Sequence, residues 1–236
     1  MNETALCSRL LSAVKYVRRG AVFADIGTDH AYLPIYLLKE GIVARAILAD
    51  INEGPLASAR ENAKAAGVLD RVKLVLTDGA SELSCEGITD VAIFGMGGEL
   101  IADIIERAPF LRDPNIRLIL QPMTKQAHLC EYLLSHGFGI VGETYTTDSG
   151  KFYRTVAASF GGGSEVQGSF AEIGLSTTPC EEIKSKTGYL RTRLSSYERQ
   201  RSGKRSASLD TAAEDALIKL INRELLRLGE GCDHDC

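Results

Sequence analysis

The sequence predicts an α/β protein with a doubly wound, mostly parallel sheet, followed by a C-terminal helical hairpin. Three observations support this. Short apolar runs alternate with helical patterns over the first 160 residues, which is the order of repeated β-α units. Most of these runs end in a loop with Asp or Gly, as ligand-binding strand ends commonly do. The last third has apolar residues at helical spacing instead.

The chain is expected to begin with an amphipathic helix within Met1 to Arg19. Leu6, Leu10, Val14 and Val17 recur there at helical spacing, and their side chains would cover the sheet. The strand-like runs that follow are Ala21 to Ala24, Ala46 to Ala49, Val72 to Leu76, Val91 to Phe94, Arg117 to Leu120 and Phe152 to Ala158.

The most informative segment follows the first run and reads DIGTDHAYLP over residues 25–34. Open α/β sheets hold adenosine-containing cofactors with three features in a row. These are an acid that closes a buried strand, a Gly that permits a tight turn, and a helix start with free amides. Asp29 and Ala31 stand where a dinucleotide loop would present bare backbone, and a carboxylate there repels a pyrophosphate. S-adenosylmethionine has no phosphate and carries two cationic groups. The turn therefore predicts a methyl-donor site that includes Asp25, Gly27 and Asp29.

The ends of the later runs supply further candidates. Asp50 closes the second run, where a carboxylate can accept from both ribose hydroxyls. Asp78 and Gly79 close the third run, where a side chain can take the adenine amino group and a Gly lets the base lie close. Gly95-Met96-Gly97-Gly98 and Gln121-Pro122 close the fourth and fifth. These loops are expected to line one edge of the sheet.

Each candidate also has a structural alternative. A lone Asp at a strand end commonly caps the next helix, but the recurrence of Asp25, Asp50 and Asp78 at successive strand ends favours binding. The three Gly around Met96 could form only a tight turn, although they also suit a loop that a flat base approaches closely. His30 could cap the following helix or contact the methyl donor.

A domain boundary is predicted where Gly161-Gly162-Gly163-Ser164 follows the last strand. We expect a catalytic domain over residues 1–160, a linker over 161–168, a helical hairpin over 169–230 and a tail over 231–236. The first arm, about 24 residues, would be about 36 Å long. A turn is expected at Ser202 to Ser206. The first arm has coiled-coil-like apolar spacing at Ile183, Leu190, Leu194 and Tyr197. The second nearly keeps this period at Ala213, Leu217, Leu220, Glu224 and Leu228.

Charge is informative locally. The net formal charge of −4 gives no hint of a polyanionic partner, yet residues 191–205 hold six basic side chains and one acid. Such a run can be a solvated helix face, or it can neutralise RNA phosphates. The second interpretation makes Arg191, Arg199 and Arg201 substrate-binding candidates, and Arg18 and Arg19 could extend their track.

Taken together, the motifs resemble the TrmK family, bacterial tRNA adenine(22)-N1-methyltransferases. The resemblance runs from about Leu6 to Ala158 and includes DIGTDHAYLP, the four residues 95–98 and GKFY at 150–153. It implies a class I (Rossmann-like) methyltransferase domain, S-adenosylmethionine as cofactor and tRNA as partner. Met123 stands where Asn is expected after Gln-Pro, and Arg154 where an acid is expected after GKFY.

The resemblance also implies roles for the site. N1 of adenine attacks the methyl group directly, so in-line positioning matters more than acid or base help. Met96 would offer an apolar surface to the base, Gln121 a hydrogen bond to its edge, and Asp29 a contact to the donor or to the charged product. Gly97, Gly98 and Pro122 would complete the pocket for the flipped base.

Composition narrows the alternatives. The 236 residues contain no apolar run near the roughly 20 residues that span a bilayer, so we expect a cytoplasmic protein without membrane contact. The six Cys lack C-x-x-C spacing, and no metal is expected, even at Cys232-Asp233-His234-Asp235-Cys236. The protein is expected to be a monomer or homodimer. A small-molecule methyltransferase and a non-catalytic donor- or RNA-binding protein remain the alternatives.

Overall fold

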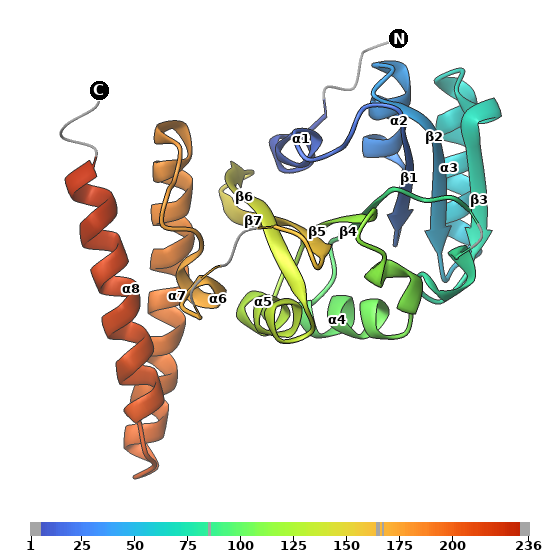
Figure 1. Ribbon diagram of the computed structural model, residues 1–236. Helices are drawn as coiled ribbons and strands as arrows, with labels where there is room; N and C mark the ends of the chain where they lie inside the picture. The colour runs from blue at the N-terminus through green and yellow to red at the C-terminus, as the bar shows by residue number, and fades with distance from the viewer. Residues whose placement is uncertain (1–5, 85, 164–165, 167, 232–236) are drawn as a thin grey trace.

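A seven-stranded sheet forms the centre of the computed structural model, which describes residues 6–84, 86–163, 166 and 168–231 (Figure 1). The strand order is β3-β2-β1-β4-β5-β7-β6. The strands are β1 (Ala21–Ile26), β2 (Val43–Asp50), β3 (Val72–Leu76), β4 (Asp90–Phe94), β5 (Arg117–Gln121), β6 (Phe138–Asp148) and β7 (Lys151–Phe160). The first five strands are parallel to one another, and β7 is antiparallel to both β5 and β6. The predicted doubly wound α/β fold is confirmed.

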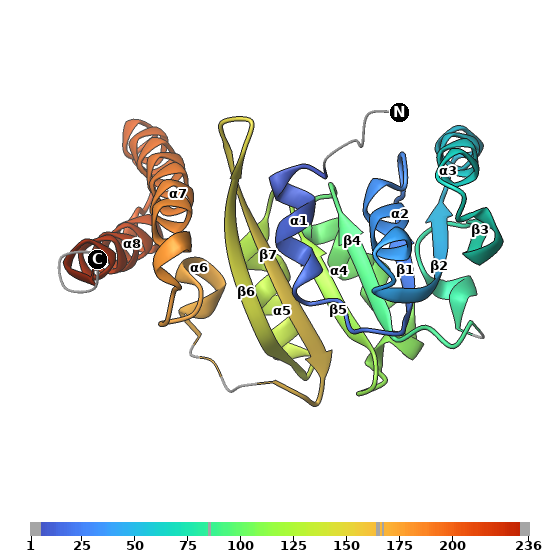
Figure 2. The ribbon, with the colours of Figure 1, turned by 90° about the horizontal axis from the view of Figure 1, so that it is seen from above.

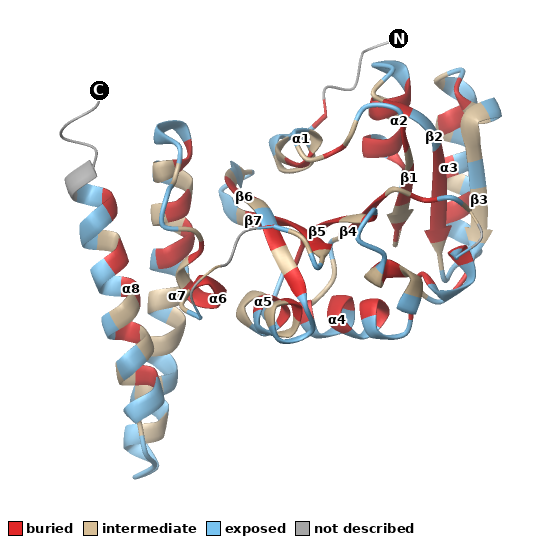
Figure 3. Ribbon diagram, in the orientation of Figure 1, coloured by how far each residue is buried: buried red, intermediate tan, exposed pale blue. Residues whose placement is uncertain are grey.

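Helices cover both faces of the sheet (Figures 1 and 2). One face carries α1 (Ser8–Val14), α2 (Tyr32–Lys39) and α3 (Glu53–Ala65), and the other carries α4 (Gly98–Glu106), α5 (Gln126–Ser135) and the short α6 (Phe170–Ile173). Two hydrophobic cores result, because inward side chains alternate along each strand. Phe23 and Leu48 face α2, while Ala24 and Ile47 belong to the core on the α4 side. Figure 3 shows that β2 is largely buried, whereas the edge strand β3 is intermediate to exposed.

The predicted hairpin is present as α7 (Cys180–Ser206) and α8 (Ala212–Gly231). The expected turn at Ser202 to Ser206 is wrong, because these residues still belong to α7. The chain reverses at residues 207–211 instead, where Ser208 has a positive φ of 56° and the Leu209 amide bonds to the Lys204 carbonyl at 2.9 Å. The 27 residues of α7 make it about 40 Å long.

Two other expectations need correction. The first helix spans only seven residues and does not reach Val17. After its end, the amides of Tyr16 and Val17 bond to the carbonyls of Ala13 and Val14 in tight turns. The long strand β6 was not predicted, since Gly139 and Gly142 interrupt its apolar pattern. The structure does not describe Met1 to residue 5, Cys85, parts of the predicted linker at 164, 165 and 167, or the Cys-containing tail at 232–236.

In the part of the chain that the structure describes, no helix is long and apolar enough to cross a membrane. The same residues contain no group of three or more His, Cys, Asp or Glu side chains that could hold a metal ion.

Candidate active site

A cavity of about 560 Å³ opens at the carboxyl ends of β1, β2 and β4. Strand order reverses between β1 and β4, and open α/β sheets bind ligands at such a switch point. The cavity is lined by seven predicted site residues, namely Asp25, Gly27, Asp29, His30, Asp50, Gly95 and Met96. It is also lined by Arg9, Leu10, Ala31, Tyr32, Leu33, Ile51, Asn52 and Phe94. The structure therefore brings most of the predicted cofactor set together.

Asp25, the second-last residue of β1, lines this cavity. Burial raises the pKa of its carboxyl from 3.8 to about 6; nearby Arg9 opposes the rise and Asp50 adds to it. Close to neutral pH the buried carboxylate is therefore ready to receive a cationic group.

Two further carboxylates line the same cavity. Asp50 ends β2, and its Oδ1 accepts the amide of Asn52 at 2.8 Å, which fixes the side chain at the strand end. Asp29 is largely exposed and lies 3.3 Å from the ring of His30. The His30 ring in turn lies against that of Tyr32, with centroids 5.3 Å apart. An exposed acid and two aromatic rings thus flank the entrance.

Met96 crosses the turn that follows β1. Gly27 has a φ of +77°, and a Cβ on it would lie 2.1 Å from the Met96 methyl carbon. Glycine therefore serves two needs at this position, the positive φ and the close approach of a neighbouring side chain. Gly95 has the same φ of +77°, which lets the loop after β4 turn back toward the cavity.

The loops after β4 and β5 are joined by backbone hydrogen bonds. The Met123 amide bonds to the Met96 carbonyl at 2.8 Å, and the Gly98 amide bonds to Thr124 at 2.8 Å. A Cβ on Gly98 would lie 2.3 Å from the Lys125 carbonyl oxygen, so the close packing of these loops accounts for this glycine. Gly98 and Pro122 are buried, whereas Gly97 is half-buried beside Thr124. The structure thus places Gly98 and Pro122 behind the cavity surface.

Gln121 is fully buried, and its amide is committed to other protein groups. Its Nε2 donates to Thr155 Oγ1 at 2.7 Å and to the Arg9 carbonyl at 3.1 Å. Its Oε1 accepts from Arg9 Nη1 at 3.1 Å. The expected direct bond from Gln121 to a substrate base is therefore not available in this arrangement.

Arg9 is the residue that sequence reasoning missed. It is the one Lys or Arg among the described residues that line the cavity, and its guanidinium lies 5.7 Å from the ring centroid of Tyr153. It belongs to α1, far from the motif at 25–34, and no pattern in the sequence distinguishes it from other surface arginines.

Asp78 and Gly79 lie outside the residues that line the cavity. The Asp78 carboxylate is exposed and pairs with Arg107 at 2.9 Å. Gly79 has a φ of +85° and lies close to Ile104 of α4. Their loop follows β3, one strand further from the switch point.

Comparison with known proteins identifies the family. A family model described as a methyltransferase domain matches residues 6–156. A curated Bacillus subtilis protein named tRNA (adenine(22)-N(1))-methyltransferase is 35% identical over 161 residues, which make up 68% of each chain. The solved structure of B. subtilis TrmK, an m1A22 tRNA methyltransferase, has a TM-score of 0.70 at 26% identity and covers 98% of this chain and 100% of that one. This chain belongs to the TrmK family.

A second solved relative of the family carries a ligand. The Streptococcus pneumoniae protein Sp1610, solved in complex with S-adenosyl-L-methionine, is 30% identical with a TM-score of 0.78. The match covers 92% of this chain and 98% of that one. The likeness therefore includes the hairpin as well as the sheet.

One departure from the TrmK pattern has a clear structural role here. Arg154 is fully buried, and its Nε donates to Glu143 at 3.0 Å. Its two other nitrogens donate to the carbonyls of Ala171 and Phe170 at 2.9 and 2.8 Å. Arg154 thus fastens α6, and with it the start of the hairpin segment, to the sheet. Met123, the other departure, is partly exposed beside Met96.

The first turns of α7 dock on β6 and β7. Glu182 accepts from Lys15 at 2.7 Å, from Thr144 at 3.1 Å and from the backbone amide of Tyr145 at 2.9 Å. On the β7 side, a Cβ on Gly188 would lie 2.2 Å from the ring of Phe152, so helix and strand touch there.

The far half of α7 carries the predicted basic run, but most of its charges are paired within the protein. Arg193 pairs with Glu172, Lys204 with Glu214 at 2.7 Å, and both Arg201 and Arg205 with Asp215 at 3.1 and 3.4 Å. Among the described residues, the exposed Arg191 and Arg199 have no ion-pair or hydrogen-bond partner. These two guanidiniums are the ones most available to a polyanion.

Arg18 does not extend this track. Its Nε donates to Asp90 at 3.1 Å and its Nη2 donates to the Asn115 carbonyl at 2.7 Å. It precedes β1 and so lies at the amino ends of the parallel strands, opposite the cavity.

Proposed function

We propose that this protein transfers a methyl group from S-adenosylmethionine to N1 of an adenine in tRNA, at position 22. The charge of the cavity carries the proposal: three carboxylates and one guanidinium surround a space free of the phosphate-binding features of dinucleotide sites. The cavity's volume of about 560 Å³ is ample for a ligand of this size. The curated relative at 35% identity is named for the same reaction.

The lining residues fit the donor part by part. Asp50, which lines the cavity, would accept hydrogen bonds from the ribose hydroxyls, and Ile51 beside it would offer an apolar contact to the adenine ring. Asp25 and Asp29 attract the ammonium end, and Arg9 attracts the carboxylate of the methionine part. S-adenosylmethionine, when bound, supplies a methyl group activated by its positive sulfur.

The target adenine is expected beside Met96, on the apolar surface that the loop after β4 presents. N1 of adenine has a free lone pair at neutral pH, so the protein has to position it rather than deprotonate it. Gln121 contributes indirectly because it holds Arg9, and Asp29 stands near the entrance where the charged product forms. No role as a general base is assigned.

The hairpin supplies the RNA contacts in this proposal. Arg191 and Arg199 would neutralise phosphates, which gives affinity and orientation without base identity. Arg201 would contribute less, because Asp215 already pairs with it at 3.1 Å. We retain the division into a catalytic domain at 1–160, a linker at 161–168 and an RNA-binding hairpin at 169–230.

The test is methyl transfer from labelled S-adenosylmethionine to unmodified bulk tRNA, with nucleoside analysis and a reaction without RNA. The expected result is labelled 1-methyladenosine, which is lost on a tRNA transcript carrying G at position 22. Donor binding without labelled RNA would overturn the proposal and favour a non-catalytic role. Transfer to a small molecule without RNA would favour a different methyltransferase class.

A further inference from the structure

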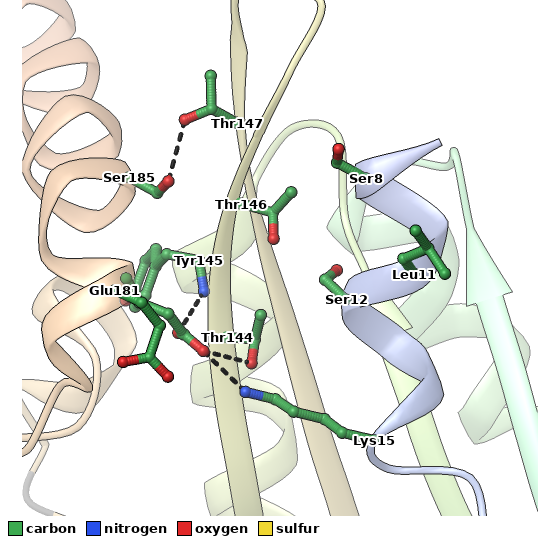
Figure 4. A pocket seen from close by; sticks show the side chains of 11 residues that line it. Ser8, Leu11, Ser12, Lys15, Thr144, Tyr145, Thr146, Thr147, Glu181 and Ser185 are labelled. Atoms are coloured by element: carbon green, nitrogen blue, oxygen red, sulfur yellow. Dashed lines mark hydrogen bonds and ion pairs between the residues drawn. The ribbon is translucent and has the colours of Figure 1, made fainter. Parts of the chain in front are cut away.

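A second hollow, of about 480 Å³, lies between α1, β6 and α7 (Figure 4). We call it the α1–α7 groove. It is separated from the donor cavity by α1, which contributes Arg9 and Leu10 to the cavity and Ser8 and Ser12 to the groove; Lys15, the residue after α1, also lines the groove. Both hollows therefore share one helix as a wall.

The groove opens on the same edge of the sheet as the donor cavity. β7 is antiparallel to both β5 and β6, so β6 runs in the same direction as β5. The groove residues of β6, Thr144 to Thr147, come from its carboxyl-terminal half. Figure 2 shows the turn between β6 and β7 at the edge toward which β2 points. The groove therefore lies at the edge where the donor cavity opens, and α7, the helix that carries Arg191 and Arg199, forms one of its walls.

The groove is lined with hydrogen-bonding side chains, and some of them have no partner. Thr147 and Ser185 bond to each other at 3.0 Å across the upper part of the hollow in Figure 4. In contrast, the side chains of Ser8, Thr146 and Glu181 make no hydrogen bond or ion pair with any residue that the structure describes. They come from three different elements, α1, β6 and α7, and line one space.

The charge of the groove excludes a phosphate as its occupant. Lys15 is the one Lys or Arg among the lining residues that the structure describes, and Glu182 neutralises it at 2.7 Å. Glu181 then leaves the groove with a net negative charge, which repels phosphate oxygens. Carboxylates and hydroxyls instead accept from the N–H groups of a base edge and bond to a ribose 2′-OH.

We propose that the α1–α7 groove binds one unpaired nucleotide of the tRNA, other than the methylated adenine, through its base edge and ribose. The proposal rests on the proposed function. The hollow has room for one nucleoside, and folded RNA exposes such bases in loops and bulges. Glu181 would accept from the N–H groups of the base, and Thr146 would bond to its edge or to the 2′-OH. The groove would thereby place the tRNA relative to the donor cavity.

The first test compares methylation kinetics of Glu181→Gln and Thr146→Val with the wild-type protein. Glu61→Gln is the matched control, because Glu61 is an exposed carboxylate on α3 without a partner in the described chain. We expect KM for tRNA to rise about tenfold for Glu181→Gln and about threefold for Thr146→Val, with S-adenosylmethionine affinity as in wild type. Unchanged KM in both variants, or an equal rise in Glu61→Gln, would overturn the proposal.

The second test uses two native thiols. Cys7 and Cys180 are exposed and directly precede the groove residues Ser8 and Glu181, whereas Cys130 is buried and serves as a reference. We expect saturating tRNA to slow iodoacetamide alkylation of Cys7 and Cys180 at least fivefold, as followed by mass spectrometry, and S-adenosylmethionine alone to have no such effect. Unchanged rates at both thiols would contradict the proposal. This readout needs no turnover, so tRNA that protects the thiols but is not methylated would refute the proposed function and leave the groove standing.

Discussion

Arg9 and Gln121 bond to each other twice across 112 positions of sequence. The Arg9 guanidinium donates to the Gln121 side-chain oxygen at 3.1 Å, and the Gln121 side-chain nitrogen donates to the Arg9 carbonyl at 3.1 Å. The pair fastens α1 to the end of β5, beside the donor cavity. It explains how a helix of only seven residues holds a charged side chain in a defined place.

Arg9→Ala should weaken S-adenosylmethionine binding about tenfold, because the cavity loses its guanidinium and a charged group's hydrogen bonds are worth about 1.5–3 kcal/mol. Isothermal titration calorimetry measures this directly. Arg19→Ala is the control, since Arg19 is exposed just before β1 at the opposite edge of the sheet. Equal affinities for wild type and Arg9→Ala would remove Arg9 from the donor site.

Asp50→Ala should also weaken donor binding, by tenfold or more, since both ribose hydroxyls lose their acceptor. Asp50→Asn is expected to recover only part of the loss, because an amide accepts more weakly than a carboxylate. The same titration, with the exposed Asp70→Ala as control, checks this. Binding of tRNA should stay as in wild type, and a parallel loss of tRNA affinity would mean that donor and RNA sites are not separate.

Ionisation of Asp25 should lower the free energy of unfolding as pH rises. Its pKa in the fold, about 6, lies above its ordinary value of 3.8, so the folded state holds more protons between these values. Stability is therefore lost as pH increases from about 4 to about 6. Asp25→Asn should be more stable than wild type at pH 8 by up to about 3 kcal/mol, with little difference near pH 4.

Urea unfolding at pH 4 and pH 8 tests this, and Asp70→Asn should behave as wild type at both. Asp25→Asn is expected to bind S-adenosylmethionine poorly, because the cationic donor favours the ionised carboxylate. A variant that gained no stability at pH 8 would show that burial of this carboxyl is not costly.

Arg191→Ala and Arg199→Ala should each weaken tRNA binding and reduce the slope of log affinity against log salt by about one. Arg201→Ala is the matched control on the same helix, and its effect should be smaller because Arg201 pairs with Asp215 at 3.1 Å. Filter binding at several salt concentrations provides the measurement. An unaltered slope in Arg191→Ala and Arg199→Ala would place the RNA elsewhere.

Arg154→Ala should lower the free energy of unfolding by about 3–5 kcal/mol, since it leaves Glu143 buried without its cation. Arg154→Lys should recover little of this free energy, because a single ammonium cannot bond to Glu143 and to both carbonyls of α6. Urea unfolding checks this against Arg60→Ala, a change on the exposed face of α3. A loss below about 1 kcal/mol would mean that α6 is held mainly by its apolar contacts.

Local signals were sufficient to predict the sheet and the centre of the cavity. Asp25, Gly27 and Asp50 sit at strand ends, and parallel strands bring their carboxyl ends to one edge whatever the details of packing. The strand β6 was missed because Gly139 and Gly142 break its pattern, although pairing with β7 stabilises it.

The remaining features of the site depend on contacts between segments that are distant in the sequence. Arg9 enters the cavity through its bonds to Gln121, and Gly98 is explained by a carbonyl from the next loop. Arg191 and Arg201 look alike in the sequence, and only the position of α8 shows that one is free and the other paired. Contacts between distant segments leave no periodic trace in one sequence.

The contact between Glu182 and Tyr145 has a consequence for the sheet itself. β6 is an outer strand, and exposed strand edges invite edge-to-edge aggregation. By accepting the Tyr145 amide, Glu182 occupies a hydrogen-bonding position that a foreign strand would otherwise use. The helix that carries Arg191 and Arg199 therefore also covers the open edge of the sheet, and we expect a chain shortened before α7 to be less soluble.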